Sequence, residues 1–268
     1  MQHHEQCFCD SFDVTALRRF NDGVALIRHG IKQYSMLVSQ ACAQDLDEQL
    51  AWLESSFDWV EHSIEIEAIM SKTGKYRKRL ELSTALAQLV ADEGRKDPDK
   101  QQIEQFFYQP RYNQFLLDMS RWLMDRGWRD ENDANISAQS QGSLQLLSCD
   151  MLNNSWRSLL QRFLDQQHFT MQDYIEHHQQ LKYSLLTGSC VGGLYGSNLR
   201  DGFRDPWVDI SSGIEELKTL ELLQSLAQQL EVDSSESTLS WLQKQTESLL
   251  HAMEQSRLQA IKMKPYWG

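Results

Sequence analysis

Residues 14–43 read VTALRRFNDGVALIRHGIKQYSMLVSQACA, and the spacing of the apolar residues in this stretch decides the fold class. The apolar positions step alternately by three and four residues along six turns: Leu17, Phe20, Val24, Ile27, Ile31, Tyr34 and Val38. This spacing places them on one face of an α-helix, because such a helix has 3.6 residues per turn. We therefore predict one long amphipathic helix from about Val14 to Ala43 that packs its apolar face against a core.

The same periodicity continues through the rest of the chain. It predicts helices near residues 45–70, 77–92, 103–107, 111–127, 144–167, 170–187, 206–231 and 237–263. We expect Pro110 to end the short helix before it, because proline has no N–H to donate. We expect the glycine-containing stretch 188–202 to be a loop. Four prolines in 268 residues also favour helices over strands and turns.

The predicted fold is therefore all-α, with two antiparallel helical bundles and no sheet. Residues 127–143 (GWRDENDANISAQSQGS) are polar and aperiodic, which is typical of a linker. We expect a flexible tail over residues 1–12, a first bundle over 13–130, a linker over 131–143 and a second bundle over 144–268. Short connections between successive helices favour antiparallel neighbours.

Charge and composition exclude several classes of function. The chain has 26 basic and 38 acidic residues, a formal charge of −12, which argues against a general nucleic-acid-binding protein. No run of about 18 apolar residues predicts a transmembrane helix, and the start, MQHHEQCFCD, does not resemble a secretory signal. The five scattered cysteines are typical of reduced thiols, so we expect a cytoplasmic protein that binds no membrane.

The densest group of cations falls at a predicted turn and helix start. It consists of Lys72, Lys75, Arg77, Lys78 and Arg79. Cations oppose the macrodipole at a helix N-terminus, and together with the free N–H groups there they favour an anionic partner. The alternative interpretation is a solvated basic corner whose side chains pair with Glu81 and Asp92.

Two further groups place histidine beside cations on predicted helices. Arg28, His29 and Lys32 lie near the apolar stripe of the first helix, either lining a groove or extending to water as an ordinary amphipathic edge. His177, His178 and Lys182 lie on the helix near 170–187, where His178 continues an apolar stripe. Such a histidine is either a hydrogen-bonded core residue or a contact to an anionic ligand.

We find no complete catalytic site and no metal site in the sequence. The Glu-x-x-His spacing of helical di-iron sites does not occur, and neither does a Cys-x-x-Cys pair. His3, His4, Cys7 and Cys9 are expected to belong to the flexible tail rather than to a metal centre. Gly74 and Lys75 lack the rest of a phosphate-binding P-loop.

Four segments together resemble a known family. They are VALIRHGIKQYSMLV (24–38), RYNQFLLDMSRWLMDRGWRD (111–130), IEHHQQLKYSLL (175–186) and SRLQAIKMKPYWG (256–268). They are similar to the C-terminal region of bacterial CYTH–CHAD inorganic triphosphatases. CHAD denotes a conserved-histidine α-helical domain of two four-helix bundles, with basic residues around a cavity that binds polyphosphate.

The resemblance implies a division of roles. Arg28, His29 and Lys32 would form one half of a polyphosphate surface, and His177, His178 and Lys182 the other half. The catalytic CYTH domain, which would use Mg²⁺ or Mn²⁺, is absent, so we expect no cofactor and no catalysis in this chain. We expect either the C-terminal part of a longer protein or a stand-alone relative. Its partners would be polyphosphate or triphosphate and a CYTH domain in the same or another chain. The alternative function is a helical protein-interaction module without a small-molecule ligand.

Overall fold

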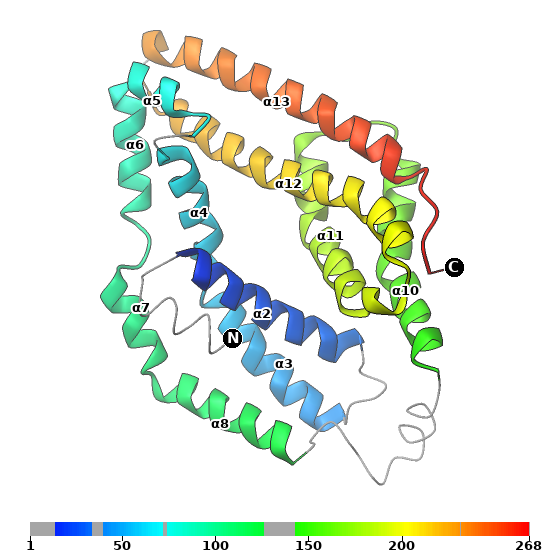
Figure 1. Ribbon diagram of the computed structural model, residues 1–268. Coiled ribbons are helices and arrows are strands. Elements are labelled where there is room, and N and C mark those ends of the chain that lie inside the picture. Colours follow the sequence, from blue (N-terminus) through cyan, green and yellow to red (C-terminus); the bar gives the residue numbers. More distant parts are fainter. Residues whose placement is uncertain (1–13, 34–39, 72–73, 126–142, 231, 268) are drawn as a thin grey trace. The chain divides into compact units, whose positions relative to one another are not determined.

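The computed structural model describes residues 14–33, 40–71, 74–125, 143–230 and 232–267. Every regular element within these ranges is a helix and none is a strand (Figure 1). The all-α prediction is therefore confirmed. The predicted tail, most of the predicted linker and Lys72 lie outside the described residues.

The contacts between Cα atoms divide the chain into two compact units. Unit 1 is Met1–Glu67 with Glu93–Gly142, and unit 2 is Ala68–Asp92 with Ser143–Gly268. The predicted division treated residues 13–130 as one bundle, whereas the contacts of residues 68–92 group them with the second half of the chain. Sequence order does not fix such a grouping, because a chain segment can pack on distant elements.

The helices of unit 1 are α2 (Val14–Gln33), α3 (Gln40–Ser55), most of α4 (Trp59–Met70), α7 (Lys100–Phe107) and α8 (Pro110–Met124). Residues of the predicted stripe, including Leu17, Phe20, Val24 and Ile31, are buried in its core. Phe20 is fully buried and packs edge-on against Phe57 and Phe107, with ring centroids 5.4 and 5.8 Å away. Burial of such a side chain contributes roughly 1.5–3 kcal/mol.

Unit 2 contains α5 (Arg77–Leu82), most of α6 (Thr84–Gly94), α10 (Leu144–Asp165), α11 (Met171–Val191), the 3-10 turn η2 (Gly192–Leu194), α12 (Ser197–Ala227) and α13 (Val232–Ala260). α12 and α13 form an antiparallel hairpin (Figure 1). Trp156, Phe163, Phe203 and Trp207 lie at the centre of the core of this unit.

Two predicted helices are interrupted next to serine residues. The helix predicted over residues 45–70 ends at Ser55, and α4 begins at Trp59. The hydroxyls of Ser55 and Ser56 donate to the Trp52 carbonyl at 2.9 and 2.8 Å at this break. The helix predicted over residues 77–92 breaks at Ser83, whose backbone is extended and whose hydroxyl accepts from the Leu86 N–H.

The predictions for the first helix, for Pro110 and for the helix near 206–231 also need correction. The structure describes α2 as Val14–Gln33, and residues 40–43 of the predicted first helix belong to a separate helix, α3, which begins at Gln40. Residues 34–39 of that prediction, with Tyr34 and Val38, lie outside the described residues. Pro110 does not merely end one helix, because it occupies the first turn of α8, where its missing N–H costs no hydrogen bond. Pro206 lies inside α12, which begins nine residues earlier than residue 206.

The predicted loop over residues 188–202 is mostly helical. α11 continues to Val191 and α12 begins at Ser197. One buried stripe continues on both sides of Pro206, at steps of three and four residues: Phe203, Trp207, Ile210, Ile214 and Leu217. Burial of this stripe stabilises α12 as one continuous helix. Gly188 serves close packing, because a Cβ there would lie 3.2 Å from the Tyr266 hydroxyl.

Candidate functional site

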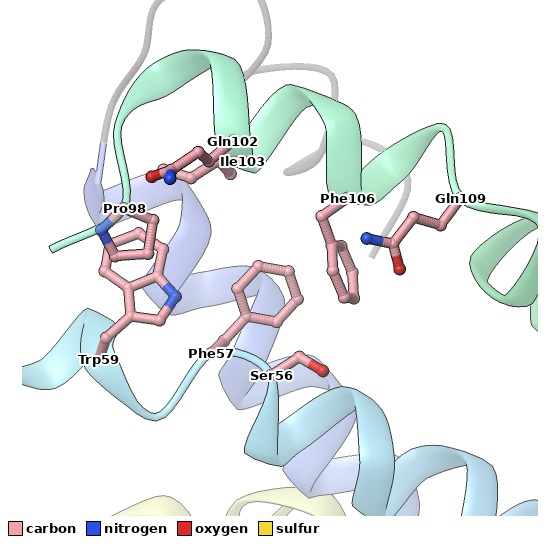
Figure 2. A pocket seen from close by; sticks show the side chains of 8 residues that line it. All are labelled: Ser56, Phe57, Trp59, Pro98, Gln102, Ile103, Phe106 and Gln109. Atoms are coloured by element: carbon pink, nitrogen blue, oxygen red, sulfur yellow. The ribbon is translucent and has the colours of Figure 1, made fainter.

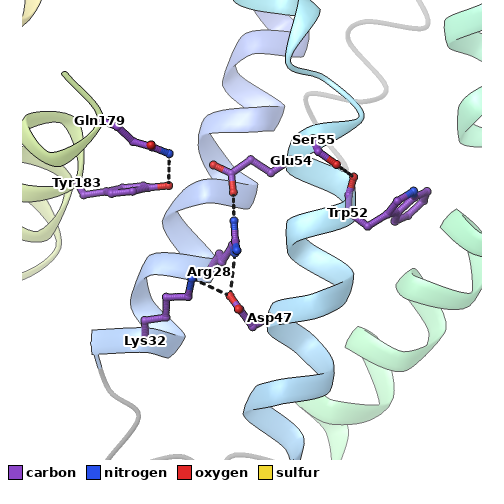
Figure 3. Close-up of polar contacts among 8 residues, drawn as sticks. All are labelled: Arg28, Lys32, Asp47, Trp52, Glu54, Ser55, Gln179 and Tyr183. Atoms are coloured by element: carbon purple, nitrogen blue, oxygen red, sulfur yellow. Dashed lines mark hydrogen bonds and ion pairs between the residues drawn. The ribbon is translucent and has the colours of Figure 1, made fainter. Parts of the chain in front are cut away.

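In unit 1, two cations of α2, Arg28 and Lys32, are bound to carboxylates of α3. Arg28 Nε lies 2.8 Å from Asp47 Oδ1, and its Nη1 lies 2.7 Å from Glu54 Oε2. Lys32 Nζ lies 3.3 Å from the same Asp47 oxygen (Figure 3). Two positive charges therefore face two negative charges. We call these four residues the α2–α3 charge cluster.

The pKa values in this cluster follow from the pairing. Burial lowers the pKa of Arg28, but the hydrogen bonds that it donates to Asp47 and Glu54 outweigh this effect and raise the pKa above its usual value. Burial raises the pKa of Asp47, but the hydrogen bond and charge of Arg28, with those of Lys32, lower it overall. Arg28 and Asp47 are therefore both ionised at neutral pH.

His29 is partly buried next to this cluster. Burial lowers its pKa, and the positive charge of Lys32 lowers it further. The imidazole is therefore neutral at pH 7 and becomes charged only below its ordinary range.

In unit 2, the basic group at residues 75–79 is also largely engaged. Lys75 Nζ lies 3.0 Å from Glu216 Oε1, and Arg77 Nε lies 2.6 Å from Glu81 Oε1. The Arg79 guanidinium lies over the Trp241 ring, 5.0 Å from its centroid. Lys78 is exposed. The pair of Arg77 with Glu81 is the one predicted for a solvated basic corner.

Tyr76 anchors this basic group to the core. It is only 3% exposed, and its hydroxyl donates to Glu216, the carboxylate that also pairs with Lys75. Burial, and then Glu216, raise its pKa well above the ordinary value, so the phenol keeps its proton. Glu216 therefore holds the chain before α5 in place.

The α11 histidines lie mainly in an aromatic environment. His178 is 8% exposed, and it continues a buried stripe with Tyr174 and Leu181. His177 is partly exposed, and its ring centroid lies 6.0 Å from Phe163 and 6.1 Å from Phe169. Lys182 is also partly exposed.

The predicted residues thus divide between the two units. Arg28, His29 and Lys32 belong to unit 1, whereas residues 75–79 and the α11 group belong to unit 2. Within each unit, acidic or aromatic side chains contact most of the predicted cations. Most of the cations that the sequence predicted for an anionic ligand therefore contact other side chains of the same unit, and the binding of polyphosphate by any of them stays a prediction.

Sequence reasoning missed Arg257, which the structure places in the core of unit 2. It is 4% exposed, and its Nε and Nη2 lie 2.7 Å from the two oxygens of Glu254. Its Nη1 donates to the carbonyls of Phe163 and Gln166, and its Nη2 donates to that of Gln167. These carbonyls lie at the C-terminal end of α10, where helical carbonyls lack internal partners. One signal in the sequence could have indicated its burial. Position 257 lies four residues after Met253 and three before Ala260, so it continues a buried helical stripe.

His62 was also missed. Its Nδ1 lies 3.0 Å from Asp97 Oδ1, and its Nε2 lies 3.8 Å from Glu93 Oε1. Thirty-five residues separate His62 from Asp97, so no local spacing in the sequence indicates the pair.

The described residues form neither a metal centre nor a membrane-spanning helix. No group of three or more His, Cys, Asp or Glu side chains among the described residues could hold a metal ion. No helix in the described segments combines the length and apolar character needed to cross a bilayer.

The fold and the candidate site define an all-helical domain whose predicted site residues lie on or next to α2, α5 and α11. A sequence profile described as the CHAD domain matches residues 1–228, so this chain belongs to the CHAD family. The crystal structure of the CHAD domain from the plant Ricinus communis is similar, with a TM-score of 0.64 at 17% sequence identity. That similarity covers 96% of this chain and 86% of the plant chain, and at this identity it supports the fold alone. A comparison with curated proteins gave no match.

Proposed function

We propose that this CHAD domain is a structural accessory domain of an inorganic triphosphatase of the CYTH type, and that it binds polyphosphate only weakly. The catalytic CYTH domain would be its partner, in the same chain or in another. The observation that carries the proposal is the engagement of Arg28 by Asp47 and Glu54 in the α2–α3 charge cluster. The link to a triphosphatase rests on the resemblance of the four sequence segments.

Paired cations contribute little to the binding of a phosphate chain. An exposed cation and a phosphate 4 Å apart attract by only about 1 kcal/mol in water. A micromolar dissociation constant corresponds to about −8 kcal/mol, so many unpaired cations are needed on one surface. The carboxylates of Asp47 and Glu54, 2.7–2.8 Å from Arg28, would repel a phosphate group that approached this arginine. The net charge of −12 adds a general repulsion.

The proposal assigns no catalysis and no cofactor to this chain. Phosphoryl transfer to water requires metal ions and positioned cations around the transferring group. Mg²⁺ or Mn²⁺ would belong to the CYTH domain. The proposal includes neither a nucleic-acid partner nor a membrane.

The first experiment tests the weak binding of polyphosphate. The full chain is titrated calorimetrically with long-chain polyphosphate at low salt. We expect weak binding for the natural sequence and at least about tenfold tighter binding for the double variant Asp47→Asn, Glu54→Gln, because it frees Arg28 and Lys32. The matched control is Asp45→Asn, Glu48→Gln, which makes the same charge change at exposed positions of the same helix. Micromolar binding by the natural sequence would contradict the proposal.

The second experiment tests structural support. A CYTH triphosphatase domain from the same genome is heated with and without this chain, and its unfolding midpoint and triphosphate turnover are measured. We expect a higher midpoint in the presence of the chain, because a partner that binds only the folded state stabilises it. An unchanged midpoint and unchanged turnover would contradict the association.

The second candidate function is a helical interaction module for another protein. On α8, Leu117 is 63% exposed and Met124 is 77% exposed, and seven residues separate them, so they share a face of this helix. Leu123 is 54% exposed beside them. Exposed apolar groups of this kind favour a protein partner over a phosphate chain. If Leu117→Gln with Met124→Gln removes the stabilisation of the CYTH domain, α8 is the surface that it contacts.

A further inference from the structure

Unit 1 contains an aromatic pocket of about 250 Å³ between the turn that joins α3 to α4 and helix α7 (Figure 2). The residues that line it are Ser56, Phe57, Trp59, Pro98, Gln102, Ile103, Phe106 and Gln109. We propose that this pocket is a binding site for a small, uncharged ligand with one aromatic ring and an attached hydrogen-bonding group. The proposal goes beyond the accessory function and does not depend on it.

The walls of the pocket are aromatic and held in place by packing. Phe57 is 1% exposed, and Phe106 meets its ring edge-on with centroids 4.9 Å apart. Phe106 in turn stacks on Trp52 at 5.4 Å, and Arg111 covers the Trp52 ring, 4.2 Å from its centroid. This chain of contacts fixes Phe106 as a preformed wall. Aromatic rings favour a further ring in edge-on or offset contact.

Pro98 and Trp59 form one end of the pocket, and Gln109 lies at the other end (Figure 2). The pair of His62 with Asp97 supports the first end. Asp97 precedes Pro98, and His62 lies one turn after Trp59 on α4, so their 3.0 Å contact ties the two sides together. The pocket is therefore held open at a fixed width rather than formed by loose loops.

The polar atoms define the hydrogen bonds that a ligand can make. The side-chain oxygen Oε1 of Gln102 already accepts a hydrogen bond from the Asp99 N–H at 2.9 Å, so the side-chain NH₂ of Gln102 remains as a donor. The Ser56 hydroxyl donates to Trp52, so its lone pairs remain as acceptors. Gln109 is exposed and carries both a donor and an acceptor at the mouth. A ligand with one donor and one acceptor matches this set.

Size and charge narrow the class of ligand. An apolar cavity of about 150 Å³ accepts benzene, so a pocket of about 250 Å³ accommodates a ring with a small substituent. None of the lining residues is ionisable. A charged group would lose its hydration there without gaining an ionic partner. The ligand is therefore neutral, which separates this site from any polyphosphate surface.

The test uses benzamide as the probe, because it has one ring, a donor and an acceptor, and no charge. Saturation-transfer NMR with the full chain measures its binding, and benzoate serves as the charged control of the same shape. We expect benzamide to bind in the low-millimolar range and benzoate to bind at least about tenfold more weakly. Absence of saturation transfer to benzamide, or equal binding of the two probes, would overturn the proposal.

Two variants locate the site. Phe106→Leu removes the aromatic wall and should weaken benzamide binding about tenfold. Gln109→Ala changes only an exposed side chain and should weaken it severalfold, so the site remains testable if Phe106→Leu fails to fold. The control Gln105→Ala alters an exposed glutamine of α7 that does not line the pocket and should bind benzamide normally. Binding that neither Phe106→Leu nor Gln109→Ala changes would place benzamide elsewhere and overturn the proposal.

Discussion

Arg28 on α2 and Asp47 on α3 form an ion pair 2.8 Å long, and its side chains are only 25% and 30% exposed. The same arginine binds Glu54, so one guanidinium connects two carboxylates a little under two helical turns apart on α3. A pair in this position joins two helices of unit 1. The pair also engages Arg28, the cation that the sequence had indicated as a contact for an anionic ligand.

This ion pair predicts an acid-dependent loss of stability. The folded pKa of Asp47 lies below its unfolded value, so its contribution is present above the unfolded pKa, near 4, and is lost as pH falls through the folded pKa. We expect Asp47→Asn to cost about 1 kcal/mol at pH 7. The difference between the natural chain and the variant should shrink below about pH 4. Urea unfolding at a series of pH values measures it, and a difference that is constant down to pH 2 would contradict the prediction.

Among substitutions of polar residues, we expect Arg257→Met to lower the free energy of unfolding most. Arg257→Met leaves the Glu254 carboxylate and the last carbonyls of α10 without their buried donor. Breaking a buried pair of this kind costs about 3 kcal/mol. Equilibrium unfolding in urea gives the value. The control is Arg162→Met, an exposed arginine in the last turn of α10, which should change stability by less than about 1 kcal/mol. Similar losses for the two variants would show that Arg257 is not a structural anchor.

Two glycine substitutions should act in opposite directions. A Cβ at Gly213 on α12 would lie 2.7 Å from Cγ and 2.8 Å from Sδ of Met253, which is buried. We expect Gly213→Ala to destabilise by about 1–2 kcal/mol through overpacking. At Gly30 on α2, no described atom beyond the adjacent residues and the local helix backbone lies within 4 Å of an added Cβ, so Gly30→Ala should stabilise by up to about 1 kcal/mol. Thermal unfolding of both variants tests the pair, and a stabilised Gly213→Ala would indicate that Met253 moves aside at little cost.

The surroundings of His29 predict a lowered pKa for this histidine. Burial, with the charge of Lys32 added, keeps its pKa below 6.5. Its NMR signal should therefore change at lower pH than that of a free imidazole. Lys32→Gln should move that pKa upward, and only slightly, because Lys32 is 54% exposed and water screens its charge. His29 therefore adds little positive charge between pH 8 and pH 7. A pKa above 7 would contradict this account.

The sequence predicted the elements of the fold better than their ends. The stripe from Leu17 to Ile31 is buried as expected, because 3.6-residue periodicity directly reports one helix face. The breaks at Ser56 and Ser83 could not be predicted, because serine hydroxyls that bind nearby backbone groups also occur inside continuous helices, as at Ser120 of α8. The continuous helix through Pro206 depends on burial of Phe203 and Trp207, which outweighs a local preference for a helix start.

The residue types of the candidate site could be predicted from the sequence, but the side chains that its cations contact mostly could not. The cations at 28, 32, 75, 77 and 79 are visible in the sequence. Apart from the pair of Arg77 with Glu81 one helical turn away, their acidic and aromatic contacts are not, because Glu54 lies 26 residues from Arg28, Glu216 lies 141 residues from Lys75, and Trp241 is more distant still from Arg79. The aromatic pocket likewise combines residues 56–59 with residues 98–109.

The sequence by itself determined the all-α class, the apolar faces of the helices and the resemblance to CHAD domains, because these depend on spacing along one segment. Only the tertiary structure decided which cations are neutralised, that Arg257 is buried, and that residues 68–92 pack with the second half of the chain. The physical reason is that Coulomb attraction and burial act through space. They depend on distances of a few ångströms between residues that are far apart in the sequence.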